Sequence, residues 1–239
     1  ELERLVLHRL WEMKEALTRA IESAEYHKFY TALHAFCASA LSAFYFDVRK
    51  DSLYCDRPDS TRRRAVRTVL DRLFQCLVTW LAPVLVFTTE ESWLSRYGET
   101  AASVHLQDFP DIPADWRDDA LAAKWATVRN LRRVVTGALE IERANRVIGS
   151  SLQAAPIVYA EPQYHEALKG LDLAEIVIAS DVVLRAEAAP EGTFQLSDVP
   201  GVAVMSQPAG GTKCQRCWRV LEEVGENPAH PEICNRCAD

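Results

Sequence analysis

Glycine is scarce in this sequence, with only nine glycines in 239 residues. None of them stands in a G-x-G-x-x-G or G-x-x-x-x-G-K-[ST] arrangement. Those are the two patterns whose backbone amides cradle phosphates at the start of a helix. The sequence therefore predicts no nucleotide-binding loop of either type in this chain.

Long apolar runs and secretory patterns are also missing. No apolar run approaches the about 20 residues that a membrane-spanning helix needs. No signal-peptide pattern is present, and three of the seven cysteines, Cys37, Cys55 and Cys76, have no pairing partner by spacing. This combination is typical of a reducing compartment. We therefore expect a cytoplasmic protein that makes no membrane contact.

The chain has no excess of positive charge, since its formal net charge is −7. With 49% hydrophobic and 26% charged residues, it has the composition of a globular protein with a core. The molecule as a whole does not attract nucleic acid. Any RNA or DNA contact must come from local basic patches.

The first residue is Glu1 rather than methionine, and helical periodicity begins at once. A helix with no start signal indicates a segment of a longer protein. The apolar positions of this first helix are Leu2, Leu5, Leu10, Met13, Leu17 and Ile21.

The most informative feature that is present is a pair of Cys-x-x-Cys motifs. Cys214 and Cys217 form the first, Cys234 and Cys237 form the second, and sixteen residues separate the two motifs. Two such turns can complete a tetrahedron around Zn²⁺ at about 2.3 Å per Zn–S bond, and this spacing is typical of four-cysteine zinc sites. Four thiolates leave no position for water. We therefore expect one structural zinc ion rather than a catalytic one.

Three other interpretations of these cysteines remain open at this point. They are two disulfides, a redox-active Cys-x-x-Cys pair, and a site in which His230 replaces one thiolate. The missing signal peptide argues against disulfides. A redox pair normally stands alone beside a βαβ unit, and His230 is more typical of a solvated loop histidine.

Amphipathic helical periodicity dominates residues 1–148 and predicts a mainly α fold. Helices are expected over about 2–23 and 25–46, after the N-cap pair Asp59-Ser60, from Pro83 through Trp93, and over about 117–146. The polar and aromatic segment 47–56 predicts a connector. Residues 98–116 predict a loop.

The hydrophobic period changes after Gly149. Residues 156–160, 175–178 and 182–184 predict strands, and 163–170 predict a short helix, which together indicate a small α+β module. The zinc unit that follows is too small for a hydrophobic core and is expected to depend on its metal for folding. We expect three parts: a helical bundle over 1–148, a junction module over 149–205 and a zinc unit over 206–239.

Two basic clusters interrupt the acidic background. The first lies between Ser60 and Trp80, where Asp71 is the single acidic residue. It contains five arginines: Arg62, Arg63, Arg64, Arg67 and Arg72. The second lies on the predicted helix over 117–146 and includes Arg129, Arg132, Arg133 and Arg143 beside its apolar stripe. A helix dipole disfavours cations in the first turn, so the first cluster predicts a phosphate-binding edge unless Asp56 and Asp59 neutralise it. The second cluster is a further candidate for binding RNA.

Four stretches carry a family resemblance: FYFDVRKDSLYC at 44–55, WLAPVLVFTTEESW at 80–93, IGSSL at 148–152, and the tail with KCQRCW at 213–218 and ICNRC at 233–237. They resemble the C-terminal region of bacterial-type isoleucyl-tRNA synthetases, which are class I aminoacyl-tRNA synthetases. The resemblance spans nearly the whole chain and is weakest over 155–205.

The resemblance implies a helical anticodon-binding bundle, a junction module and a zinc unit that helps to hold the tRNA anticodon arm. It implies that the four tail cysteines are zinc ligands, and that Arg216 and Trp218 meet the anticodon. We further expect Lys213 and Arg219, which flank these residues, to contact the RNA. An indole fixed beside a metal knuckle offers a flat face to an unstacked base. In the other interpretation Trp218 only covers the zinc sulfurs.

The family's ATP-binding signatures, resembling His-Ile-Gly-His and Lys-Met-Ser-Lys-Ser, are both absent from this sequence. We therefore expect ATP and Mg²⁺ to bind a catalytic domain of the same polypeptide, and this chain alone to be inert. The expected partners are isoleucine tRNA and that catalytic domain, in a monomer. Two alternatives remain: a DNA-binding zinc module like that of repair glycosylases, and a purely structural zinc clamp.

Overall fold

The structure is a computed structural model, and it describes all of residues 1–239. The chain forms two compact units, and each is made of two separate segments. Unit 1 comprises Glu1–Tyr45 and Pro58–Asp119, and unit 2 comprises Phe46–Arg57 and Ala120–Asp239. The mainly α fold with a small sheet and a four-cysteine tail is confirmed. The boundaries at 148 and 205 stay a prediction.

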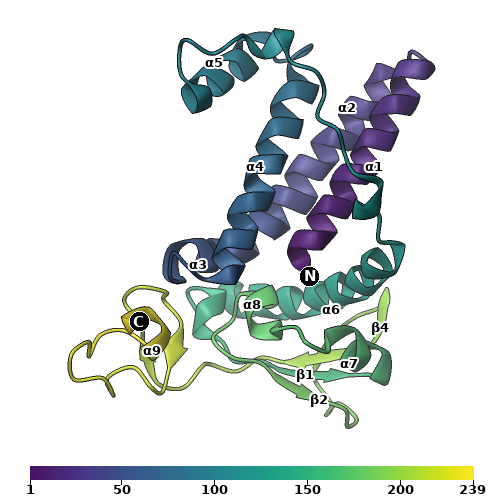
Figure 1. The fold of residues 1–239 in the computed structure, drawn as a ribbon. Helices are drawn as coiled ribbons and strands as arrows, with labels where there is room; N and C mark the ends of the chain where they lie inside the picture. The colour runs from purple at the N-terminus through teal and green to yellow at the C-terminus, as the bar shows by residue number, and fades with distance from the viewer. The chain divides into compact units, whose positions relative to one another are not determined.

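Unit 1 is helical (Figure 1). It contains α1 (Leu2–Glu22), α2 (Tyr26–Ala35) with the π-helical stretch η1 (Phe36–Phe46), α4 (Thr61–Leu81), α5 (Val86–Tyr97) and the 3₁₀ turns η2 (Val104–Leu106) and η3 (Ala114–Trp116). Helix α1 packs against α2 and α4. Between α2 and α4 the buried Phe29 ring meets Trp80 edge to face, with 6.1 Å between their centroids.

The helix starts and ends of unit 1 follow local chemistry. Ser60 caps α4 as expected, since its hydroxyl accepts a hydrogen bond from the Arg63 amide. The prediction that Pro83 lies in the first turn of the next helix is wrong, because α5 begins only at Val86. Pro83 instead follows the C-cap residue Ala82 in the turn after α4. Proline is common at that place because it cannot continue a helix.

The helix that begins at Tyr26 is longer than the sequence suggests. It continues through η1 into α3 (Asp47–Cys55), so the prediction of a connector over 47–56 is wrong. Polar residues of α3 are buried because they find partners, and Arg49 pairs with Glu175 at 2.8 Å. By length and composition alone, Tyr26–Cys55 is apolar enough to cross a membrane, which corrects the expectation of no such run. The core helix of a globular protein passes the same test.

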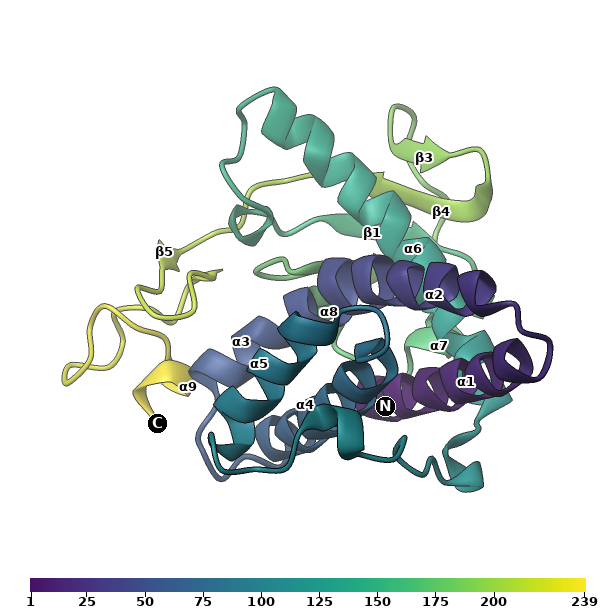
Figure 2. The same cartoon turned by 90° about the horizontal axis from the view of Figure 1, so that it is seen from above.

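Unit 2 combines helices with a four-stranded sheet, and Figure 2 shows α6 along that sheet. Its helices before the tail are α3, α6 (Asp119–Ala144), the 3₁₀ turn η4 (Ser151–Gln153), α7 (Pro162–Leu168) and α8 (Leu173–Val177). Its strands are β1 (Ile157–Ala160), β2 (Val183–Arg185), β3 (Phe194–Leu196) and β4 (Val199–Met205). The strand order is β2-β1-β4-β3, with only β1 and β2 parallel.

One predicted strand of unit 2 is a helix. Residues 175–178 were expected to be extended, but they belong to α8 and its C-cap. The Asp172 carboxylate accepts a hydrogen bond from the Glu175 amide and starts the helix, and Ile178 ends it in the left-handed region at φ 59°. A short apolar run is ambiguous because buried strands and buried helices share that pattern. The strands predicted at 156–160 and 182–184 are confirmed by β1 and β2.

The tail of unit 2 has little regular structure. It contains β5 (Thr212–Lys213), β6 (Val220–Leu221) and the short helix α9 (Asn235–Ala238). Strands β5 and β6 pair as an antiparallel ribbon. The buried residues of this region are mostly the four motif cysteines, together with Val224.

Candidate zinc centre and nucleic-acid interface

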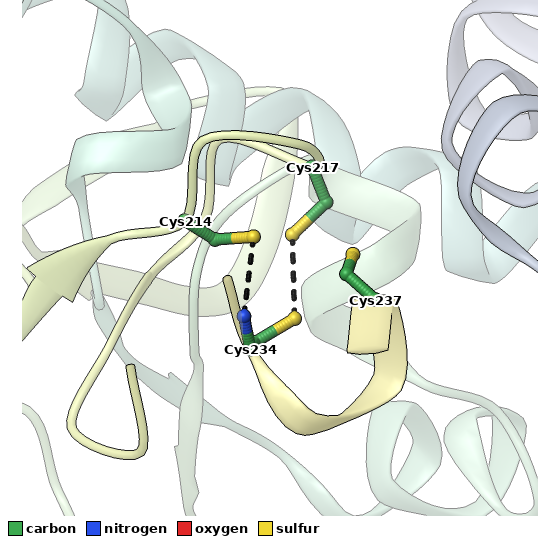
Figure 3. Close-up of side chains that lie close together, drawn as sticks. All are labelled: Cys214, Cys217, Cys234 and Cys237. Atoms are coloured by element: carbon green, nitrogen blue, oxygen red, sulfur yellow. Dashed lines mark hydrogen bonds between the residues drawn. The ribbon is translucent and has the colours of Figure 1, made fainter. Parts of the chain in front are cut away.

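The four motif cysteines converge on one point (Figure 3). Their sulfur atoms all lie within 4.8 Å of one another, and the Cys217 and Cys234 sulfurs are 3.8 Å apart. A tetrahedron with Zn–S bonds of about 2.3 Å requires sulfur separations of about 3.8 Å. All seven cysteines are free thiols, so the disulfide interpretation is not supported. His230 lies outside the group. The residues present fit one structural zinc ion.

Backbone hydrogen bonds shape the knuckle that carries the first two ligands. The Cys214 amide donates to the Arg219 carbonyl at 2.8 Å, and the Trp218 amide donates to the Cys214 carbonyl at 2.9 Å. Trp218 adopts a left-handed backbone conformation with φ 67°. The Cys234 amide points at the Cys214 sulfur at 3.4 Å, which brings the second motif to the first.

Burial and backbone hydrogen bonds act in opposite directions on these thiols. Burial favours the neutral form of Cys214, but hydrogen bonds from the backbone of Cys217, Cys234 and Arg216 outweigh it and lower the pKa of Cys214 to about 6. Burial raises the pKa of Cys217 to about 12 and raises the pKa of Cys237 as well. Four ionised thiols therefore need a cation among them, and a bound divalent ion supplies that charge.

The zinc knuckles are fastened to α3 of the same unit. The Arg236 guanidinium makes two hydrogen bonds to the Asp51 carboxylate, at 2.5 and 2.8 Å, and lies 3.8 Å from Asp56. Arg216 donates to the Cys237 carbonyl at 2.8 Å and to the Tyr54 carbonyl at 3.4 Å. Cys55 belongs to the same buried cluster as the four ligands.

A second group of hydrogen bonds joins the residues after the first Cys-x-x-Cys motif to the loop after α8. The Arg219 guanidinium donates through Nε and Nη2 to the Ser180 carbonyl. The Ser180 hydroxyl accepts a hydrogen bond from the Val220 amide at 2.6 Å and donates to the Leu152 carbonyl. Arg219, expected at the RNA surface, thus has an internal partner in this structure.

The other predicted contacts of the tail lie at the surface. Lys213, Arg216 and Trp218 are exposed, and the Lys213 ammonium lies 5.5 Å from the centre of the Trp218 ring. That distance is within the range of a cation–π interaction. Trp218 is 60% exposed, so its side chain is accessible beside the cysteine cluster.

The basic cluster of α4 lines an open groove in unit 1. The groove has a volume of about 640 Å³ and is lined by Arg64, Arg67, Thr68, Leu70, Asp71, Arg72, Phe74 and Arg96. Arg64 and Arg67 are exposed, whereas Arg62 and Arg63 are half-buried and do not line it. Arg96 comes from α5 and pairs with Asp71 at 2.5 Å. Sequence reasoning missed Arg96, because only the packing of α5 on α4 brings it to the cluster.

The arginines of α6 differ from one another in their surroundings. Arg132 donates to the Ile176 carbonyl at 2.9 Å, and burial lowers its pKa. Arg133 pairs with Asp198 at 2.7 Å and Arg143 with Glu140 at 2.6 Å, both at the surface. Arg129 is half-buried. Arg132 therefore holds α8 against α6, while Arg133 and Arg143 remain accessible.

Comparisons with known proteins agree with this geometry. Residues 3–158 match the family described as "Anticodon-binding domain of tRNA ligase", and residues 211–239 match "Zinc finger found in FPG and IleRS". The chain is 52% identical over its whole length to isoleucine–tRNA ligases of Mesorhizobium japonicum and Brucella abortus, and 51% identical to that of Agrobacterium fabrum. It spans about a quarter of the length of these relatives.

Proposed function

Because the chain belongs to the family of anticodon-binding domains of tRNA ligases, we propose that it recognises the anticodon arm of isoleucine tRNA within an isoleucine–tRNA ligase. The observation that carries this proposal is the order of two matches in one chain, an anticodon-binding region followed by a four-cysteine zinc finger. Anticodon loops offer unstacked bases, which proteins read by stacking and by hydrogen bonds to the base edges.

We assign the RNA contacts to two surfaces, one on each unit. On unit 2 they are the exposed Lys213, Arg216 and Trp218 beside the zinc knuckle. On unit 1 they are Arg64 and Arg67 in the α4 groove, with Arg62 and Arg63 next to them. Guanidinium groups in an open groove can neutralise backbone phosphates without reading sequence.

The other arginines predicted to contact RNA differ in the partners they have within the protein. Arg133 and Arg143 stay within the proposal as supporting phosphate contacts, since their exposed ion pairs are weak and exchange easily for a phosphate. Arg129 is half-buried and stays a candidate for a supporting contact. Arg132 and Arg219 are half-buried and donate to carbonyl groups of the protein, so a contact with RNA would require them to give up those bonds. Arg216 also donates to two carbonyl groups, but it is exposed and remains accessible.

The reaction of the whole enzyme is the ATP-dependent attachment of isoleucine to its tRNA. This chain contains neither ATP-site signature, so ATP and Mg²⁺ belong to a catalytic domain of the same polypeptide and this part alone is inert. We place the enzyme in the cytoplasm, as a monomer without membrane contact.

The alternative of a DNA-binding zinc module rests on the tail alone. The zinc finger family takes its name from two classes of protein, so its match is neutral between them. The anticodon-binding match over 3–158 and the identity over the full length favour the tRNA ligase.

An electrophoretic titration at two salt concentrations tests the proposal. We expect the zinc-loaded chain to bind isoleucine tRNA more tightly than an unrelated tRNA of the same length. The affinity for both should fall with salt, because each phosphate contact contributes about 0.7–0.9 to the logarithmic slope. Equal affinity for the two tRNAs, or preference for duplex DNA, would refute the proposal.

A further inference from the structure

Two aromatic side chains near the zinc centre are unusually exposed. Tyr54 on α3 is 74% exposed and Trp218 in the knuckle is 60% exposed. Single exposed apolar residues are common on protein surfaces and need no explanation by themselves. These two are distinctive because they come from segments more than 160 residues apart in the sequence, and Arg216, two residues before Trp218, donates a hydrogen bond to the Tyr54 carbonyl.

Arg216 connects the two segments. Its Nη2 donates to the Tyr54 carbonyl at 3.4 Å and its Nη1 donates to the Cys237 carbonyl at 2.8 Å. Trp218 follows it by two residues in the turn that the metal ligands close. The guanidinium is therefore fixed in position, and an indole and a phenol ring belong to the two segments that it connects.

Further contacts hold α3 and the zinc cluster together beneath this surface. Two hydrogen bonds join Arg236 to Asp51, one turn of α3 before Tyr54. The Cys55 side chain is buried within the zinc cluster, on the residue next to Tyr54. Figures 1 and 2 both show α3 beside α9. A surface held in this way presents its aromatic rings with little loss of conformational entropy on binding.

Two cations accompany the two aromatic residues. Lys213 lies over the Trp218 ring and Arg216 is exposed between the two chain segments that it connects. Aromatic faces combined with cations are the features of surfaces that bind single-stranded nucleic acid, because every base has a face that can stack and every linkage carries a negative charge. An apolar protein partner would not require the cations.

We propose that Tyr54 and Trp218 together form a stacking platform for two unpaired bases of an RNA loop, with Arg216 and Lys213 contacting the linking phosphates. This inference rests on the proposed function and extends it to Tyr54. This residue belongs to α3 and lies outside the zinc-finger match over residues 211–239. Zinc holds the Trp218 side of the platform, and α3 holds the Tyr54 side.

Alanine substitutions with matched controls test the platform. Tyr54→Ala and Trp218→Ala are each expected to weaken binding of isoleucine tRNA by roughly 5- to 150-fold, the loss typical of one stacked base. Tyr54→Phe should bind like the unsubstituted protein, because stacking does not need the hydroxyl. Tyr26→Ala removes a tyrosine that is 52% exposed on α2 and should change nothing. Zinc content and circular dichroism of each variant establish that it is folded.

The salt dependence separates stacking from charge. Tyr54→Ala should lower the affinity equally at both salt concentrations, whereas Lys213→Ala should reduce the logarithmic salt slope by about 0.7–0.9. If Trp218→Ala weakens binding while Tyr54→Ala binds within twofold of the unsubstituted protein, the platform is refuted and the proposed function stands. If the unsubstituted protein does not prefer isoleucine tRNA, the proposed function and the platform both fail.

Discussion

At the scale of single residues, the zinc ligands were the easiest part to predict. Two Cys-x-x-Cys motifs at the right separation constrain four sulfurs so strongly that the sequence identifies all of them. The contacts around the ligands were harder. Arg216 and Arg219 lie three residues apart in sequence, yet Arg219 bonds to the Ser180 carbonyl and Arg216 reaches the Tyr54 carbonyl. No local pattern distinguishes two such arginines, because their partners are remote in the chain.

The ligand assignment can be tested by substitution. Cys234→Ser should lower the zinc content from about one ion per chain to near zero, because a serine hydroxyl does not replace the fourth thiolate. Residues from about 206 onward should then unfold, since metal binding supplies the folding free energy of so small a unit. Metal analysis and circular dichroism measure the two effects.

Cys37→Ser is the matched control, because Cys37 lies in the helix of unit 1 and outside the metal group. It should retain its zinc. Loss of all helical signal in Cys234→Ser would contradict a tail that folds separately from the helices of unit 1, and retention of zinc would contradict the four-thiolate site.

At the scale of secondary-structure elements, the long amphipathic helices were predicted well and the short apolar segments were not. The expected helices over 2–23 and 117–146 match α1 and α6 to within two residues at each end. The prediction of a connector over 47–56 fails because Arg49, Ser52 and Asp56 are buried with partners rather than exposed. Strand β4 contains Pro200 and Gly201, two residues that argue against a strand in sequence.

The fastening of the tail to α3 gives a prediction at this scale. Arg236→Ala removes two charge-assisted hydrogen bonds to Asp51, each of a kind that contributes about 1.5–3 kcal/mol when its partner is shielded from water. The pair is about one-third exposed, so we expect the lower end of that range. Hydrogen exchange of the amides in α3 should become faster, while zinc is retained.

Arg133→Ala is the control for that experiment. It breaks a surface ion pair with Asp198, and exposed ion pairs contribute little to stability. Exchange in α3 should be unchanged in this variant. If Arg236→Ala also leaves exchange in α3 unchanged, the bond to Asp51 does not hold the tail to the helix.

At the scale of the whole molecule, the sequence predicted a mainly α protein with a zinc-bound end, and the structure and the comparisons agree with both. The grouping of Phe46–Arg57 with Ala120–Asp239 could not be predicted. It depends on Arg49, Asp51 and Cys55, whose partners lie more than 120 residues later in the chain. Local periodicity contains no information about such contacts.

This grouping matters for function because it attaches an exposed tyrosine to the zinc knuckle. The family resemblance predicts the helical bundle and the zinc tail as two separate parts of the chain. In the structure, unit 2 contains both a segment of the helical region and the metal site. The proposal therefore assigns the stacking contacts to unit 2 and the phosphate contacts of α4 to unit 1.

Recognition of the anticodon loop itself is tested most directly by comparing two forms of one RNA. The zinc-loaded protein is titrated with isoleucine tRNA and with the same tRNA made abasic at its anticodon nucleotides, at one moderate salt concentration. We expect the abasic form to bind at least tenfold more weakly with the same salt slope, because the phosphates remain and the stacking faces are gone. Equal affinity for the two forms would contradict recognition of the anticodon by this chain.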